Sequence, residues 1–259
     1  MSKKLETQVF GKEIYRYEEV TSTNEVARNM AKEGASEGLV VIADSQNKGR
    51  GRLGRSWQSP KGQGVWMSVI TRPQIQVQDI PAITLITGLA VCKAIRQTTS
   101  LPAYIKWPND IVVDGKKVCG ILTQMSGDAS KINYVIIGIG INVNIESFPE
   151  ELEEVATSLK IEGGQNYDRE EISISTLEFL ELYYKEYIKV GSLENVLDKY
   201  KDLCITLKNQ VLVLDDKKPY KATPLDIDKR GGLIVVREDG GKETIKFGEV
   251  SVRGIYGYA

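Results

Sequence analysis

The 259-residue sequence predicts an α+β protein with a large N-terminal domain and a small β-rich domain at its C-terminus. Before residue 207, short apolar segments typical of buried strands occur together with longer segments whose apolar residues recur at helical spacing. From about Val211 onward the pattern changes to short strands separated by Asp and Gly turn residues. The strands predicted in this small domain are 211–214, 219–227, 232–238 and 242–247.

The strands of the large domain are predicted from short runs of Val, Ile and aromatic residues. The dipeptide Asp114-Gly115 predicts a tight hairpin turn between two of them. Glycine stands at alternate positions of the last strand, which indicates close approach of a ligand or of another backbone. The predicted strands are 13–20, 38–43, 64–70, 104–107, 111–113, 116–123 and 134–144.

The helices are predicted from start signals followed by apolar residues at helical spacing. Residues 21–24, Thr-Ser-Thr-Asn, supply capping side chains for the first helix, and Gly34 is its stop signal. Asp79 and Pro81 open the second helix. The predicted helices are 25–32, 79–98, 168–188 and 193–203.

The composition excludes several classes of protein. Lys and Arg number 34 against 35 Asp and Glu, so the basic excess expected of bulk nucleic-acid binding is missing. The absence of histidine excludes histidine-based catalytic triads and the commonest nitrogen ligand of metals. The three cysteines, Cys92, Cys119 and Cys204, lack a paired metal-binding spacing, and we expect buried, reduced thiols. No apolar run long enough to cross a membrane and no signal core is found, so we expect a cytoplasmic protein.

The most informative segment is Gly49–Trp57, with the sequence Gly-Arg-Gly-Arg-Leu-Gly-Arg-Ser-Trp. Its glycines allow the backbone to approach a ligand, and its arginines supply donors for phosphate or carboxylate groups. Because it lies between two predicted buried strands, we interpret it as a mobile loop that closes over an anionic ligand. The alternative is an Arg/Gly segment that binds RNA without sequence preference.

A second group of polar residues surrounds the hairpin at 111–123. Asp110 follows a predicted strand beside Asn109 and close to Lys106, and Lys117 lies in the next strand. Pro-Asn-Asp alone is also ordinary turn chemistry. Together with the Arg/Gly loop, however, these residues provide cations for a phosphate and a carboxylate for a metal or a proton. Such a set is expected where a carboxylate attacks a nucleotide phosphate.

These segments resemble the successive motifs of the biotin protein ligases, in the order of that family and over nearly the whole chain. The Arg/Gly loop and Lys-Trp-Pro-Asn-Asp are together highly specific, whereas either alone is only suggestive. The matching segments are Ser22-Thr23-Asn24, Gly49–Trp57, Lys106–Asp110, Lys117–Leu122 and Gly138–Asn144.

The resemblance implies a two-step reaction. Biotin and Mg-ATP give biotinyl-5′-AMP and pyrophosphate, and a lysine of a biotin carboxyl carrier domain of acetyl-CoA or pyruvate carboxylase then takes the biotin and releases AMP. The implied fold is a mixed sheet with helices similar to the class II aminoacyl-tRNA synthetase core, followed by an SH3-like barrel. The implied domains are a catalytic domain over residues 1–206 and the barrel over residues 207–259. Mg²⁺ would accompany ATP, no tightly bound metal is expected, and a homodimer is left open.

The resemblance also implies which residues form the site. The catalytic residues would be Arg52, Lys117 and Asp110, where Asp110 is either the general base for the acceptor lysine or a tentative Mg²⁺ ligand. Biotin would be bound by Ser22, Thr23, Asn24, Gln46, Gly49, Arg50, Gly51, Arg52, Lys117 and Gly120. ATP or the adenylate would be bound by Arg50, Arg52, Arg55, Trp57, Lys106, Asn109 and Asn142. Trp57 and Trp107 are also interpreted as packing anchors.

Two departures from the family pattern qualify this expectation. The family often has an acidic residue near the position of Gln124, which can form hydrogen bonds but carries no charge. About twenty residues precede Ser22, too few for the helix-turn-helix domain of some family members, so no DNA binding is expected. The nearest enzyme alternative, lipoate–protein ligase, usually has a histidine after its phosphate loop, and this chain has none.

Overall fold

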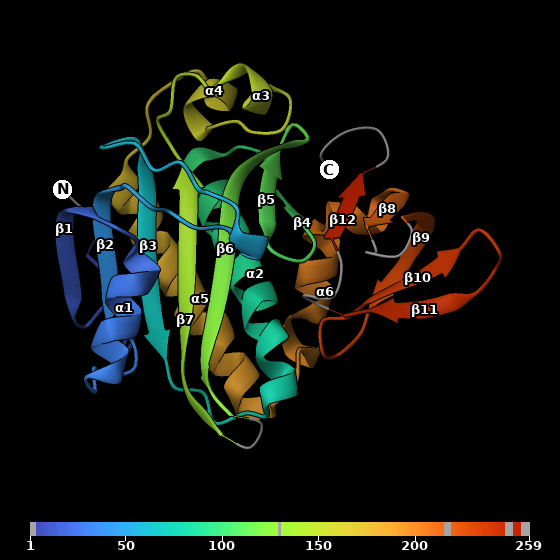
Figure 1. Ribbon diagram of the computed structural model, residues 1–259, viewed down its shortest axis with the longest axis horizontal. Coiled ribbons are helices and arrows are strands. Elements are labelled where there is room, and N and C mark those ends of the chain that lie inside the picture. Colours follow the sequence, from blue (N-terminus) through green and yellow to red (C-terminus); the bar gives the residue numbers. More distant parts are fainter. Residues whose placement is uncertain (1–3, 129–130, 215–218, 247–250, 255–259) are drawn as a thin grey trace.

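A seven-stranded mixed sheet forms the body of the protein in the computed structural model, which describes residues 4–128, 131–214, 219–246 and 251–254 (Figure 1). The strand order is β1-β2-β3-β7-β6-β5-β4, where only β1 and β2 are parallel neighbours. All strands predicted for the large domain are confirmed. Their bounds are β1 Ile14–Val20, β2 Val40–Gln46, β3 Gly64–Thr71, β4 Tyr104–Lys106, β5 Asp110–Val113, β6 Lys116–Gly127 and β7 Ile132–Asn142.

The four predicted helices are also confirmed as α1 Thr23–Lys32, α2 Ile80–Thr99, α5 Arg169–Val190 and α6 Glu194–Leu203. Two short helices, α3 Glu150–Glu153 and α4 Leu159–Gly163, were not predicted, because a single turn is too short to show an apolar periodicity. Three 3₁₀ turns complete the helical elements: η1 Arg52–Gly54, η2 Val77–Asp79 and η3 Ile205–Lys208.

The two faces of the sheet are covered by different helices. Val40 of β2 and Val69 of β3 belong to the cluster that packs on α2 and α5, whereas their neighbours Val41 and Ile70 pack against α1. This alternation follows from the two-residue period of a strand. Strands buried on both faces read as continuous apolar runs, and β3 is buried at every position.

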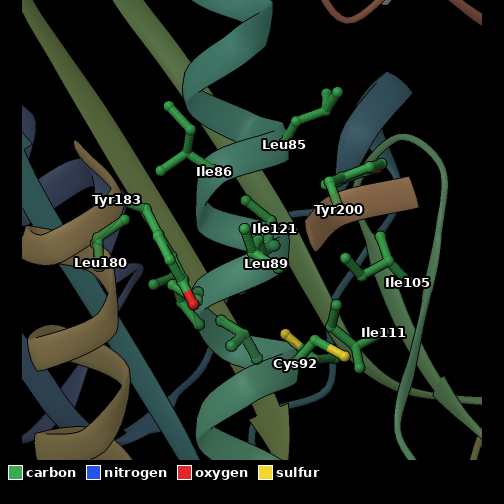
Figure 2. Packing of buried hydrophobic residues seen from close by; sticks show 14 of the residues in the cluster. Leu85, Ile86, Leu89, Cys92, Ile105, Ile111, Ile121, Leu180, Tyr183 and Tyr200 are labelled. Atoms are coloured by element: carbon green, nitrogen blue, oxygen red, sulfur yellow. The ribbon is translucent and has the colours of Figure 1, made fainter. Parts of the chain in front are cut away.

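The larger core lies between the sheet and α2, α5 and α6. Figure 2 shows Leu85, Leu89 and Cys92 along α2, with Leu180 and Tyr183 of α5 on one side of the helix and Tyr200 of α6 on the other, all within one buried cluster. The helical segment Val77–Thr99 is long and apolar enough to span a membrane by length and composition, contrary to our expectation that no such run exists. The window that passes this test is 72% buried, because the helix packs on the sheet and α5.

The start of α1 differs from the expected capping. Ser22 occupies the N-cap position, but its side chain makes no capping hydrogen bond. Thr23 and Asn24 instead direct their polar groups toward side chains of the sheet, where Ser68 of β3 donates hydrogen bonds to both. The side-chain hydrogen bond expected of an N-cap residue is therefore not formed at this helix start, where the neighbouring side chains face the sheet and the candidate site.

The C-terminal unit is a five-stranded antiparallel sheet with the order β11-β10-β9-β8-β12 (Figure 1). The four predicted strands are confirmed, and a fifth, β12, was not predicted. The predicted turn at Asp215-Asp216 lies outside the described residues. Trp107, directly after β4, joins this unit to the large sheet, since its Nε1 donates to Gly231 O at 2.9 Å. Its backbone N–H donates to Thr206 Oγ1 of η3 at 2.9 Å. The strand bounds are β8 Val211–Leu214, β9 Tyr220–Ile227, β10 Leu233–Arg237, β11 Lys242–Ile245 and β12 Ser251–Gly254.

Candidate active site

A cavity of about 300 Å³ lies between the start of α1, the Arg/Gly loop and strands β5, β6 and β7. It brings together all the site residues predicted from the sequence except Gly49, which is not on its wall. The predicted residues that line it are Ser22, Thr23, Asn24, Gln46, Arg50, Gly51, Arg52, Arg55, Trp57, Lys106, Asn109, Asp110, Lys117, Gly120 and Asn142.

The charges on this wall favour an anionic ligand. Five cationic residues line the cavity, but Asp110 is the one acidic residue among the described lining residues. Positive charges that are gathered in a concave site attract phosphates and carboxylates. The cations are Arg50, Arg52, Arg55, Lys106 and Lys117.

The Arg/Gly loop folds back on itself between β2 and β3. The N–H of Gly51 donates to Arg55 O at 2.7 Å, and the N–H of Arg55 donates to Arg52 O at 3.2 Å. Leu53 at the tip has a φ of 55° and is 72% exposed. Gly49 permits the crossing of the two loop arms, because a Cβ there would lie 2.3 Å from Trp57 O. Closure of this loop over a ligand stays a prediction.

Trp57 at the end of the loop lies on two paired glycines of the sheet. Gly120 of β6 is opposite Gly140 of β7, and a Cβ on Gly140 would lie 2.5 Å from the indole Nε1. The ring is also 5.1 Å from Lys117 Nζ, within the range of a cation–π contact. The alternate glycines of β7 therefore admit an aromatic ring to the backbone at this point. The indole Nε1 is buried without a hydrogen-bond partner in the part of the chain that is described.

A chain of charged and polar groups crosses the cavity floor. Lys117 Nζ lies 2.7 Å from Asp110 Oδ1, and Asn109 Nδ2 donates to the same oxygen at 3.1 Å. Arg52 NH1 donates to Asn109 Oδ1 at 2.7 Å, which connects the Arg/Gly loop to β5. The hairpin turn predicted at Asp114 brings Lys117 back beside Asp110. The two motifs identified separately in the sequence thus form one network.

The segment after β7 completes the cavity and was missed by sequence reasoning. Lys117 N–H donates to Val155 O at 2.9 Å, and Thr157 N–H donates to Lys117 O at 2.9 Å, so this segment pairs with the start of β6 and fixes the Lys117 backbone. Asn142 Nδ2 donates to Thr157 O at 3.1 Å. The only signal in the sequence would have been apolar residues in an otherwise acidic stretch. The lining residues missed here are Phe148, Leu152, Val155 and Ala156.

The opposite wall is polar and uncharged. Thr23 N–H donates to Gln46 Oε1 at 2.8 Å, and Gln46 Nε2 donates to Ser59 Oγ at 2.7 Å. Asn24 Nδ2 donates to Gln124 Oε1 at 2.9 Å, so Gln124 accepts a hydrogen bond from the Ser-Thr-Asn motif instead of holding a charge there.

Two other expectations concern thiols and metals. Burial raises the pKa of the Cys204 thiol to about 11 and that of the Cys92 thiol to about 12, and it raises the pKa of Cys119 further. These cysteines are free and buried, as predicted. Within the described residues, no three Asp, Glu, Cys or His side chains are grouped to hold a metal ion.

Comparison with known proteins agrees with the motifs. The Biotin/lipoate A/B protein ligase family matches residues 17–142, and the Biotin protein ligase C terminal domain matches residues 209–253.

Individual relatives match most of the chain. The bifunctional ligase/repressor BirA of Bacillus spizizenii is 36% identical over 241 residues, covering 92% of this chain and 74% of that protein. The biotin–[acetyl-CoA-carboxylase] ligase of Mycobacterium tuberculosis is 30% identical over 234 residues, covering 86% of this chain and 82% of its own. The structure of the Aquifex aeolicus biotin protein ligase with biotin and ATP is 32% identical, with a TM-score of 0.81 over 94% of this chain and 99% of that one. The chain belongs to the biotin protein ligase family.

Proposed function

We propose that the protein activates biotin with ATP as biotinyl-5′-AMP and transfers the biotin to a lysine of a biotin carboxyl carrier domain. The observation that carries this function is the Lys117–Asp110 pair, 2.7 Å apart on the wall of a cavity that five cationic residues line. The similarity to a ligase structure containing biotin and ATP supports the choice of these two ligands.

In the first step a biotin carboxylate oxygen attacks the α-phosphorus of ATP. The new P–O bond replaces the bond to the pyrophosphate leaving group, and negative charge grows on the oxygens around the phosphorus. Lys117 and Arg52, which are already oriented by Asp110 and Asn109, would stabilise that charge. Arg50 on the loop is the further cation for the carboxylate or the phosphate.

In the second step the acceptor amine attacks the carbonyl carbon of the mixed anhydride, and AMP leaves with the electron pair of the broken C–O bond. A lysine amine is mostly protonated at neutral pH, so it must lose a proton before attack. We assign Asp110 as the base that takes it, because its carboxylate is buried beside the cavity. The alternative is that Asp110 contacts a metal ion. The two roles are distinguished by which half-reaction slows when Asp110 is mutated.

Mg²⁺ fits this site as part of the ATP substrate. Oδ1 of the Asp110 carboxylate is engaged by Lys117 and Asn109, and no group of three metal-ligating side chains is present in the described residues. We therefore propose that Mg²⁺ arrives bound to the phosphates of ATP and supplies charge neutralisation there.

We further propose that residues 1–206 are the catalytic domain and residues 207–259 an SH3-like barrel. The five antiparallel strands between Val211 and Gly254, together with the match over residues 209–253, support this division. The carrier domain as partner is implied by the family. A cytoplasmic location, a homodimer and the absence of DNA binding stay predictions.

The first half-reaction is tested by exchange of labelled pyrophosphate into ATP. We expect exchange that depends on added biotin and Mg²⁺, and none with lipoate or octanoate. Exchange with lipoate but not with biotin would assign the site to the other branch of the family.

A further inference from the structure

One buried serine lies behind the polar wall of the cavity without reaching the cavity itself. Ser68 of β3 is fully buried and is not a lining residue. Its hydroxyl donates to Asn24 Oδ1 at 2.6 Å and to Thr23 Oγ1 at 2.8 Å, so one hydrogen serves two acceptors in the first turn of α1. Both acceptors line the cavity.

The sheet is built to admit this contact. Ser68 is opposite Gly138 of β7, and a Cβ on Gly138 would lie 2.1 Å from Asn24 Oδ1. The glycine therefore leaves the space in which the Asn24 amide reaches the serine. Asn24 is held on its other side by Gln124. Ser68 of β3 and Gln124 of β6 thus hold this helix turn by hydrogen bonds, and Gly138 of β7 leaves the room for them.

The hydrogen count determines what this wall offers a ligand. The Thr23 hydroxyl donates its own hydrogen to Gln46 Oε1 at 3.2 Å and accepts from Ser68, so its remaining capacity is a lone pair. Gln46 Nε2 donates one hydrogen to Ser59 Oγ, and its second hydrogen meets no acceptor among the described residues. Thr23 is therefore an acceptor, and beside it Gln46 is a donor.

We propose that Ser68 is a positioning residue that fixes Thr23 as a hydrogen-bond acceptor for a ring N–H of the cyclic urea of biotin. This inference rests on the proposed function, because it takes biotin as the ligand. A cyclic urea presents N–H donors next to a carbonyl acceptor, which complements an acceptor beside a donor. Without Ser68, Thr23 and Asn24 lose the hydrogen bonds that hold the first turn of α1 against β3, so the Thr23 oxygen is no longer fixed in position to accept from the ring N–H.

The test compares Ser68→Ala with Ser175→Ala. Ser175 is a matched control, because it is another fully buried serine, but it lies in α5 and its Oγ has no hydrogen-bond partner in the described chain. The dissociation constants of biotin and of ATP are measured by calorimetry. A third ligand is the biotin analogue with a cyclic carbamate, in which an oxygen replaces one ring N–H; both isomers are used.

We expect Ser68→Ala to weaken biotin binding about tenfold and to leave ATP binding within about twofold of the unchanged protein. One carbamate isomer lacks the N–H that donates to Thr23, and we expect Ser68→Ala to weaken its binding little further. The ratio of the dissociation constants of this carbamate and of biotin is therefore smaller in Ser68→Ala than in the unchanged protein. Ser68→Cys, which keeps a weak donor, gives an intermediate loss and serves if the alanine variant does not fold.

Equal biotin affinity in Ser68→Ala and Ser175→Ala would overturn the inference while leaving the proposed function intact. A parallel loss for biotin, ATP and both carbamates would also overturn it, because it would indicate general structural damage. If the unchanged protein does not bind biotin at all, the proposed function fails and this inference fails with it.

Discussion

The Lys117 ammonium lies 2.7 Å from a carboxylate oxygen of Asp110, so the cation proposed for adenylate formation and the base proposed for transfer are ion-paired. The pair crosses one β-hairpin, and Asn109 donates to the same Asp110 oxygen. Each side chain therefore orients the other, and replacing one changes the environment of its partner. The first two predictions follow from this coupling.

We expect Lys117→Ala to slow biotinyl-AMP formation about 10²–10³-fold, because a preoriented charge on the developing negative oxygens is lost. Pyrophosphate release under single-turnover conditions measures this step. Lys116→Ala is the control, since Lys116 is the neighbouring residue and donates to Glu153 O at 2.8 Å instead of to the site. Equal effects of the two substitutions would contradict the assignment of Lys117.

We expect Asp110→Asn to slow transfer from supplied biotinyl-AMP more than it slows adenylation, because the amide cannot take the proton of the acceptor lysine. A smaller loss in adenylation is also expected, since Lys117 loses its carboxylate partner. Both half-reactions are measured separately, with Asp114→Asn in the hairpin turn as control. If adenylation is abolished and transfer is spared, Asp110 is a metal ligand and not the base.

Gly140→Ala should impair ATP use while preserving the fold. Its Cβ would lie 2.5 Å from Trp57 Nε1 and 2.8 Å from Cε2, so the indole ring has to leave the sheet. We expect the KM for ATP to rise about tenfold, as for the loss of one good contact. Gly88→Ala in α2 is the control, because its Cβ meets ordinary contacts at 3.7 Å or more. An unchanged KM would show that the position of Trp57 is unimportant for the nucleotide.

Glu181 provides a prediction on pH and stability. Burial raises the pKa of this carboxyl, but hydrogen bonds from Lys185 and from the backbone of residues 8–10 outweigh burial and lower the pKa to about 2. The unfolded chain has a glutamate pKa of about 4.3. Because the folded value is lower, the stabilisation is full above the unfolded pKa and is lost as the pH falls toward about 2.

Glu181→Gln should therefore lower the free energy of unfolding at neutral pH by about 2–3 kcal/mol, and the difference from the unchanged protein should shrink in acid. Urea unfolding at several pH values measures it, with the exposed Glu154→Gln as control. A difference that does not depend on pH would contradict this account.

Much of the fold was predictable because its signals are local. The continuous apolar run of β3, the Asp114-Gly115 turn and the change of pattern near Val211 each lie within a short segment, and the structure confirms the elements that they predict. The missed elements lack such signals. β12 is a four-residue strand defined by its pairing with β8, and α3 is a single turn.

The same distinction applies to the site. The Arg/Gly loop and Lys106–Asp110 were found as motifs, whereas the bond between Arg52 and Asn109 depends on two segments 57 positions apart. Val155 lines the cavity because its backbone carbonyl pairs with β6, which no pattern in the sequence expresses. Ser68 was missed for a related reason, since a serine within a buried strand looks like an ordinary core position until its partners on α1 are known.

The central claim is that this cavity forms biotinyl-5′-AMP and passes biotin to a carrier lysine. It is tested most directly by incubating the protein with ATP, Mg²⁺, a biotin carboxyl carrier domain and either biotin or lipoate, and then determining the acceptor mass and the modified residue by mass spectrometry. The account predicts one biotin added to one lysine, dependent on ATP, and no lipoate. A carrier that gains lipoate but no biotin, or that gains nothing although the protein is folded, would contradict it.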